Sequence, residues 1–282
     1  MHGRPGFFFL NEIMKRIALL ATVSFSATLL LGCRDTPTGN ADTWTLAWSD
    51  EFEGAAGSPP SPAIWSPEVG TGWGNAQLEY DTDRPSNAAL DGAGNLVITA
   101  RREAFGGQQY TSARLTTAGK RAVLYGKVEA RMMLPRGQGM WPAFWMLGAD
   151  VATVGWPATG EIDIMEYRGQ EPGTVIGSLH GPGYSGGGAL TRRYTPAATR
   201  FDNAFHVFTI EWTTDRVDWF VDGTHYFAAR KDAVPGRWAF DHPFNIILNL
   251  AVGGNFVGAP NEFTTFPQAM VVDWVRVYQR AQ

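Results

Sequence analysis

Three acidic side chains within six residues are the strongest chemical signal in this chain. Glu161, Asp163 and Glu166 interrupt a run that is otherwise apolar, Glu-Ile-Asp-Ile-Met-Glu-Tyr over residues 161–167. Because side chains alternate between the two faces of a β-strand, the first two acids are expected on one face and the isoleucines between them on the other. Glycoside hydrolysis uses a pair of carboxyl groups, so two carboxyl groups on one open face indicate this reaction.

Glu166 does not fit strict alternation. A regular strand would turn it into the core, where an unpaired carboxylate is costly, whereas a β-bulge around Met165 returns it to the acidic face. With that bulge, strand geometry brings the carboxyl groups of Glu161 and Glu166 to about 5 Å from each other. Retaining glycosidases have this separation, so we predict double displacement with retention.

The order of the acids suggests their roles. We assign Glu161 as the nucleophile and Glu166 as the acid that protonates the leaving oxygen and then activates water. Asp163 lies between them, where it raises the pKa of a neighbour and orients Glu161. The alternative is a solvated strand face that is merely acidic. Like charges on one face repel and no basic residue interrupts this run, which favours catalysis.

The rest of the sequence predicts one all-β domain over residues 44–282. The chain has 282 residues, of which 44% are hydrophobic, enough for one large core. Alternating or β-branched runs recur between turn signals, with Asp222-Gly223 as a hairpin tip, and no long segment has a helical stripe. The predicted strand runs include residues 96–100, 126–132, 205–212, 217–223 and 270–278.

The first 33 residues have the pattern of an export signal. Lys15-Arg16 precede an apolar stretch that ends in Leu30-Leu31-Gly32-Cys33, and Cys33 is the only cysteine. This end resembles the lipobox of bacterial lipoproteins, which implies cleavage before Cys33, lipidation of that residue and a short linker over residues 34–43. An ordinary secretory peptide and an uncleaved anchor helix are the alternatives; the apolar run is short for a full span. In each case the domain is exported, either anchored at the membrane or cell surface or secreted.

Charge argues against a polyanionic partner. Without residues 1–33 the chain has 20 basic and 26 acidic residues, a formal charge of −6. We therefore expect no nucleic-acid partner. We also expect membrane contact only through a lipid at Cys33, and a monomer.

The acidic motif and several other segments resemble glycoside hydrolase family 16 in its laminarinase-like form, which has the bulged motif. The matching segments are Trp73-Gly74-Asn75, residues 139–147, His180-Gly181, residues 244–254 and residues 273–278. The resemblance covers about Trp44 to Tyr278. It implies a β-jelly-roll sandwich of two antiparallel sheets with a concave substrate cleft, and endo-hydrolysis of β-1,3-linked glucans without a catalytic cofactor.

Aromatic and polar residues are expected to line that cleft. Trp141 and Trp145 are four residues apart and hence on one strand face if no bulge intervenes, as sugar platforms or as core filling; the resemblance favours platforms. It also implies sugar contacts for Asn75 and Arg114, which otherwise read as loop or surface residues. His180 resembles a family histidine near the acid/base, although a lone histidine is often structural. Trp156 either lines the cleft or braces it.

The resemblance further implies a structural Ca²⁺ on the convex side. Its ligands would be Glu53, the backbone carbonyl of Gly94, and Asp273. Oxygen donors suit this cation, but three scattered ligands without an acidic loop are a weak pattern by themselves.

Two segments depart from the family pattern. Gln77 and Glu79 stand in reverse order to many relatives, and Asn255-Phe256 replaces a frequent tryptophan. A mixed-linkage β-1,3-1,4-glucanase and a transglycosylase are the rival enzymes, although dedicated lichenases and xyloglucan transferases generally lack the extra residue that Met165 represents. A non-catalytic β-glucan-binding protein is the third alternative, but such proteins typically lack one or both glutamates.

Overall fold

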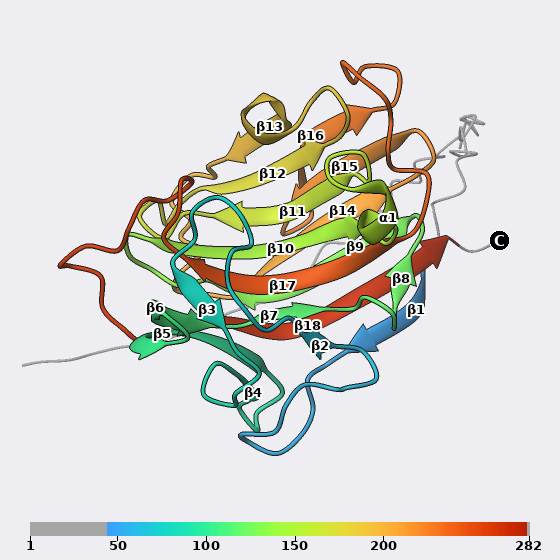
Figure 1. Cartoon of the computed structure of the whole chain (residues 1–282). Helices are drawn as coiled ribbons and strands as arrows, with labels where there is room; N and C mark the ends of the chain where they lie inside the picture. Colours follow the sequence, from blue (N-terminus) through green and yellow to red (C-terminus); the bar gives the residue numbers. More distant parts are fainter. Residues whose placement is uncertain (1–43, 281–282) are drawn as a thin grey trace, which may run out of the picture. The chain divides into compact units, whose positions relative to one another are not determined.

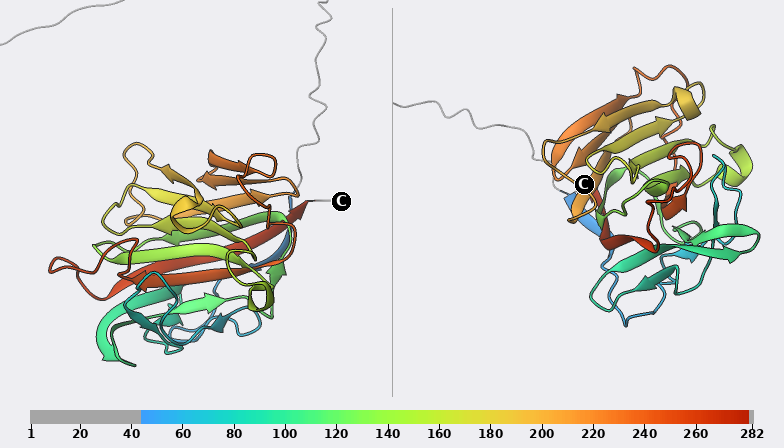
Figure 2. Two further views of the ribbon diagram at one scale, coloured as in Figure 1. Left: turned by 45° about the horizontal axis from the view of Figure 1, so that its top comes forward. Right: turned by 90° about the vertical axis from the view of Figure 1, so that its left-hand side faces the viewer.

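The protein folds as two stacked, curved β-sheets in a computed structural model that describes residues 44–280 (Figures 1 and 2). The predicted signal peptide, Cys33 and the linker over 34–43 lie outside the described residues. Within the described part, helix is limited to α1 (Val151–Val154) and a 3₁₀ turn, Gly186–Gly188. No helix in residues 44–280 has the length and apolar character that a membrane span requires. The all-β prediction is confirmed.

One sheet has eight strands, and it carries the acidic motif. Its order is β13 (Leu190–Tyr194), β12 (Val175–His180), β11 (Glu161–Tyr167), β10 (Met140–Gly148), β17 (Phe244–Val252), β7 (Arg114–Thr116) and β2 (Ser66–Pro67), and β8 (Ala122–Val123) pairs with β17. The motif strand β11 is therefore an interior strand, hydrogen-bonded on both sides.

The other sheet has ten strands. Its order is β16 (Thr224–Arg230), β15 (Arg216–Val221), β14 (His206–Trp212), β9 (Gly126–Met133), β18 (Gln268–Arg280), β5 (Leu96–Phe105), β6 (Gln108–Ser112) and β3 (Glu79–Asp81), while β1 (Trp44–Asp50) pairs with β18 and β4 (Ala88–Leu90) with β5. Pairing is antiparallel except between β3 and β6. The five predicted strand segments all fall within or closely overlap observed strands of this sheet.

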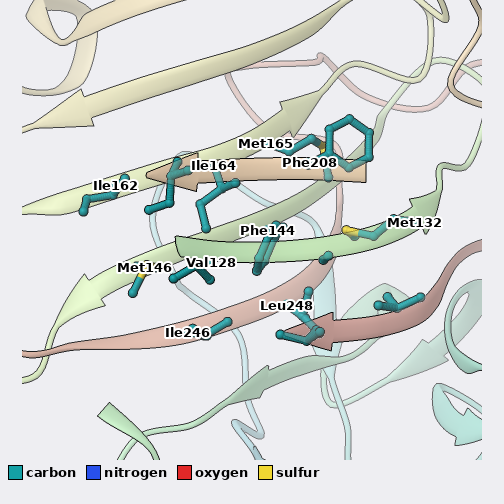
Figure 3. Packing of buried hydrophobic residues seen from close by; sticks show 14 of the residues in the cluster. Val128, Met132, Phe144, Met146, Ile162, Ile164, Met165, Phe208, Ile246 and Leu248 are labelled. Atoms are coloured by element: carbon teal, nitrogen blue, oxygen red, sulfur yellow. The ribbon is translucent and has the colours of Figure 1, made fainter. Parts of the chain in front are cut away.

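The core lies between the two sheets. Apolar side chains from both inner faces fill it, with Phe144 and Ile246 from the eight-stranded sheet meeting Val128 and Phe208 from the ten-stranded sheet (Figure 3). At roughly 25 cal/mol per Å² of apolar surface removed from water, such packing is the main force that holds the sheets together. Because one face of β11 packs in this core, the opposite face of the eight-stranded sheet is available for catalytic side chains.

The predicted bulge in β11 is present. Pairing of β11 with β12 shifts between Asp163 and Glu166, and pairing with β10 skips one residue between Asp163 and Met165. Ile164 and Met165 are consecutive, yet both are buried in the core (Figure 3). Two successive inward side chains are what a bulge produces, and the next residue, Glu166, consequently faces outward.

The turn at Asp222-Gly223 is also confirmed. Val221 pairs with Thr224 across it, and both turn residues have positive φ, 48° and 75°. Such angles characterise the tight hairpin turns whose twist matches that of the flanking strands.

Candidate active site

The three acids form a row on the open face of β11. Glu161 pairs with Leu147 of β10 and with His180 of β12, at the start of the strand. The Glu161 side chain keeps 18% of its surface exposed and that of Asp163 only 5%. The bulge thus lines up all three carboxyl groups, and the one in the middle is the most enclosed.

His180 contacts the first two acids. Its Nε2 lies 3.0 Å from Oδ2 of Asp163 and 3.7 Å from Oε1 of Glu161, while its Nδ1 accepts the backbone N–H of Gly186 at 3.1 Å. Because Nδ1 accepts, the proton of the neutral ring is on Nε2, toward the two carboxyl groups. His180 therefore contacts Glu161 and Asp163, and it also lowers the pKa of Glu166, the acid/base near which the resemblance implied a histidine.

Trp141 contacts Glu166. Its indole Nε1 donates to Oε1 of Glu166 at 3.1 Å, and its ring lies 4.8 Å from that of Phe256. Arg168 lies over the other aromatic ring, with Cζ 4.3 Å from the Phe256 centroid. Phe256 thus occupies the position where the sequence lacks the frequent tryptophan, and it supports Trp141 beside the acid.

Burial and mutual repulsion raise the pKa of all three acids. Burial, then the charge of Asp163, raises the pKa of Glu161 to about 8, while His180, Trp156 and Arg114 act in the opposite direction. Burial raises the pKa of Asp163 to about 7, opposed by its interaction with Glu161. At neutral pH, protons therefore remain within the row, and the acids titrate together.

Glu166 is the acid whose neighbours most favour a proton. Burial raises its pKa to about 8, and the charges of Asp163 and then Glu161 add to the increase, against His180 and Trp141. Glu161 interacts with one carboxylate and with three groups that stabilise its anion, whereas Glu166 interacts with two carboxylates and with two such groups. This asymmetry favours an ionised Glu161 and a protonated Glu166.

Trp145 lies on the same strand face as Trp141. Strand β10 keeps a regular register with β17 throughout, so no bulge separates the two tryptophans, as predicted. The Trp145 Nε1 donates to Oδ1 of Asn249 at 2.8 Å, which fixes the ring. Sequence reasoning missed Asn249, although polar Asn245 and Asn249 at four-residue spacing in the otherwise apolar β17 were an available signal.

Arg114 joins this aromatic group. Its Cζ lies 4.8 Å from the Trp145 ring centroid and 4.9 Å from that of Trp73, and its guanidinium pairs with Glu68. The cation is therefore held between two indoles, a geometry that supports both rings. The Arg114 charge also lowers the pKa of Glu161.

Trp156 and Asn75 occupy loops at the site. Trp156 is 49% exposed, its ring lies 6.1 Å from that of His180, and its side chain lowers the pKa of Glu161. Asn75 is exposed and has a positive φ of 52°. Its carbonyl accepts the N–H of Asn255 at 2.7 Å, so the two loops that depart from the family pattern are hydrogen-bonded to each other.

A buried acidic pair supports the first of these loops. Glu79 and Asp81 are each 1% exposed, and Oε2 of Glu79 accepts the N–H of Val252 at 2.7 Å. Burial raises the pKa of Glu79 to about 7. Burial, followed by the charge of Glu79, raises that of Asp81 well above its usual range. The burial of this pair is not predictable from the sequence, because the three residues of β3 do not show which strands cover them.

The proposed calcium ligands fit the cation in part. Glu53 Oε1 lies 3.7 Å from where a Cβ on Gly94 would be, so these two ligands are adjacent. Asp273, at a register shift of β18, pairs instead with the guanidinium of Arg131. Among residues 44–280, the group of acidic and histidine side chains with metal-ligand spacing is Glu161, Asp163 and His180, whose ligand atoms lie within 4.8 Å of one another. Because these atoms already contact one another, we regard that trio as catalytic.

Comparisons with known proteins find similar sequences and similar folds. The model of "Glycosyl hydrolases family 16" matches residues 73–276. A beta-glucanase of Rhodothermus marinus is 40% identical over 281 residues, 96% of each chain. The glucan endo-1,3-beta-glucosidase A1 of Niallia circulans is 37% identical over 263 residues, but this chain covers only 38% of its length. The laminarinase catalytic domain of Thermotoga maritima MSB8 superposes with a TM-score of 0.80 at 47% identity, over 85% of this chain and 99% of that one.

Proposed function

Because this chain belongs to glycosyl hydrolases family 16, we propose that it is an endo-β-1,3-glucanase that cleaves laminarin-like glucans with retention. Relatives named for β-1,3-glucan hydrolysis cover most of the chain. One structural observation supports the mechanism most directly: the bulge at Ile164-Met165 turns Glu166 to the face that carries Glu161.

The residues of this chain then have distinct roles. Glu161 attacks the anomeric carbon while Glu166 gives its proton to the glycosidic oxygen, so the old C–O bond breaks as the glycosyl–Glu161 ester forms. Glu166, now ionised, takes a proton from water, whose oxygen attacks the anomeric carbon and releases Glu161. Asp163 and His180 orient Glu161. Trp145 offers a flat apolar face to the sugar rings, and Trp141, which is 8% exposed, borders the same face beside Glu166, with Asn75, Arg114 and Trp156 as further sugar contacts.

Two enzymatic alternatives belong to the same proposal. Relatives named endo-1,3-1,4-beta-glycanase, from Rhizobium meliloti, are 31–33% identical, so mixed-linkage cleavage is the first. Transglycosylation, in which a second sugar replaces water, is the other. A β-1,3-glucan-binding protein of Penaeus monodon also aligns, 35% identical over 171 residues. The presence of all three acids here argues against a purely binding role.

Product analysis tests the function. The mature domain is incubated with laminarin, lichenan, xyloglucan, agarose and carrageenan, with Glu166→Ala as control, and the products are separated by size. We expect a ladder of short oligosaccharides from laminarin, with the β-anomer formed first by proton NMR. Binding without cleavage by the unsubstituted protein would establish the glucan-binding alternative, and a first-formed α-anomer would exclude retention.

For localisation, we propose export and lipidation at Cys33, with the domain as a monomer attached through the linker over 34–43. The support is the apolar run that ends at this single cysteine. Mass spectrometry of the mature N-terminus and the membrane fraction of a bacterial expression host provide the test. Cys33→Ser should remove the lipid mass and release the protein from membranes; unchanged fractionation would contradict the proposal.

A further inference from the structure

The backbone of the bulge that positions Glu166 accepts a hydrogen bond from a side chain of the opposite sheet. Trp219, on β15 of the ten-stranded sheet, donates its indole Nε1 to the backbone carbonyl of Asp163 at 2.8 Å. Trp219 is 0% exposed and Asp163 is 3% exposed. The bond therefore lies within the buried core and joins the two sheets at the point where the register of β11 shifts.

Trp219 donates a hydrogen bond at the point where the bulge disrupts strand pairing. An extra residue disrupts the ladder of a strand pair, yet a buried carbonyl needs a donor. Strand neighbours at this point are Trp145 on one side and Ser178 on the other, and both registers change directly after Asp163. Trp219 supplies an N–H donor to the Asp163 carbonyl from the ten-stranded sheet rather than from a neighbouring strand of β11.

The surroundings hold the indole in place. Its ring stacks on Phe227 with centroids 4.6 Å apart. Gly177, on β12, leaves the space that the indole uses: a Cβ there would lie 2.7 Å from Cδ1 of Trp219 and 2.6 Å from the hydroxyl of Tyr226. A glycine in an interior strand costs stability unless a close approach requires it, and the indole makes such an approach.

We infer that Trp219 is a positioning residue for catalysis: its hydrogen bond to the Asp163 carbonyl holds the bulge in the geometry that aims Glu166 at the glycosidic oxygen. This rests on the proposed function. Trp219 touches no substrate, so its effect passes through the backbone of β11. A displacement of about 1 Å at a catalytic group can lower the rate by 10²-fold.

The test compares Trp219→Phe with Trp212→Phe. Trp212 makes the same kind of buried bond, Nε1 to the carbonyl of Phe240 at 3.1 Å, but on β14 and away from the bulge. Each variant is assayed for kcat/KM on laminarin and on 2,4-dinitrophenyl β-laminaribioside, whose leaving group departs without a proton, and its Tm is measured.

We expect Trp219→Phe to lose roughly 10- to 100-fold in kcat/KM on laminarin and clearly less on the dinitrophenyl substrate, because acid catalysis is what misplacement of Glu166 impairs. Trp212→Phe should change kcat/KM less than about twofold on either substrate while its Tm falls similarly. Equal kinetics for the two variants would overturn the inference. An unsubstituted protein that is inactive on laminarin would instead overturn the proposed function.

A second variant covers the case in which Trp219→Phe does not fold. Gly177→Ala keeps the indole N–H but pushes on the ring through its new methyl group. It should show the same selective loss on laminarin. A folded Gly177→Ala protein with normal kcat/KM on both substrates would count against the inference.

Discussion

The indole Nε1 of Trp141 lies 3.1 Å from Oε1 of Glu166, so one oxygen of this carboxyl group already has a donor. The proton of the neutral acid is consequently favoured on the other oxygen, Oε2. A residue that the sequence suggests as a sugar platform thus also orients the proton that the leaving group needs.

Replacement of Trp141 by phenylalanine should shift the pH profile. The indole N–H lowers the pKa of Glu166, so its loss raises that pKa further. Because Glu166 must be protonated to act as the acid, the alkaline limb of kcat/KM should move up by roughly half to one pH unit. Trp145→Phe, which loses a bond to Asn249 instead, is the control. An alkaline limb that stays in place or moves down would contradict this prediction.

Replacement of His180 by alanine should affect the acidic limb. His180 stabilises the anion of Glu161, so without it the pKa of Glu161 rises and the acidic limb of kcat/KM moves to higher pH. We also expect kcat to fall roughly tenfold or more, since Asp163 and Glu161 lose an orienting contact. His206→Ala, whose ring pairs with Asp222 elsewhere, serves as control. An unchanged acidic limb would mean that His180 is only structural.

Replacement of Arg114 by alanine should weaken substrate binding. The guanidinium lies between Trp145 and Trp73, so its removal loosens the platform, while its effect on the pKa of Glu161 is smaller than those of His180 and Trp156. For laminari-oligosaccharides we expect KM to rise several-fold while kcat changes little; each tenfold corresponds to about 1.4 kcal/mol. Arg102→Ala removes a similar cation–ring contact, on Tyr110, and is the matched control. A loss confined to kcat would show that Arg114 acts on the chemistry instead.

Replacement of Glu79 by glutamine should change how stability depends on pH. The pKa of Glu79 is about 7 in the folded protein, above the ordinary glutamate value of the unfolded chain. The folded state therefore binds the proton of Glu79 more tightly than the unfolded chain does. This tighter proton binding stabilises the fold fully below about pH 4.5, and the stabilisation is lost as pH rises through about 7. Relative to the unsubstituted protein, Glu79→Gln should gain stability between pH 5 and 8.

Urea unfolding at both pH values measures this difference. Glu68→Gln, at a half-buried acid paired with Arg114, is the control. A stability difference between Glu79→Gln and the unsubstituted protein that does not change with pH would show that Glu79 is ionised in the fold throughout this range.

Calcium should stabilise the domain if Glu53, Gly94 and Asp273 bind it. At a free concentration 100-fold above Kd, binding adds about 2.7 kcal/mol, which for a domain of this size raises Tm by roughly 5–10 °C over the EDTA-treated protein. Asp273→Asn should reduce this shift, and Asp232→Asn, at an exposed acid paired with Arg230, should not. Calcium titration by calorimetry checks the same site. An equal Tm in EDTA and calcium would exclude it.

The acidic motif was predictable because its signal is local. Alternation of side chains along one strand is set by backbone geometry, so the sequence alone shows that Glu166 needs a bulge to avoid the core, and the structure confirms a bulge at Ile164-Met165. The hairpin at Asp222-Gly223 was predictable for the same reason, since two adjacent residues define it. The all-β architecture followed from short alternating runs and turn signals.

Only the tertiary structure decided which distant residues serve that motif. Trp145 and Asn249 are 104 residues apart, Glu79 and Val252 are 173 apart, and Asp163 and Trp219 are 56 apart. Strand order in a sheet is set by packing between segments far apart in the chain, which no local pattern records. The amino-acid sequence by itself therefore determined the catalytic groups and the face they share, whereas the stacking of two sheets decided what holds those groups in place.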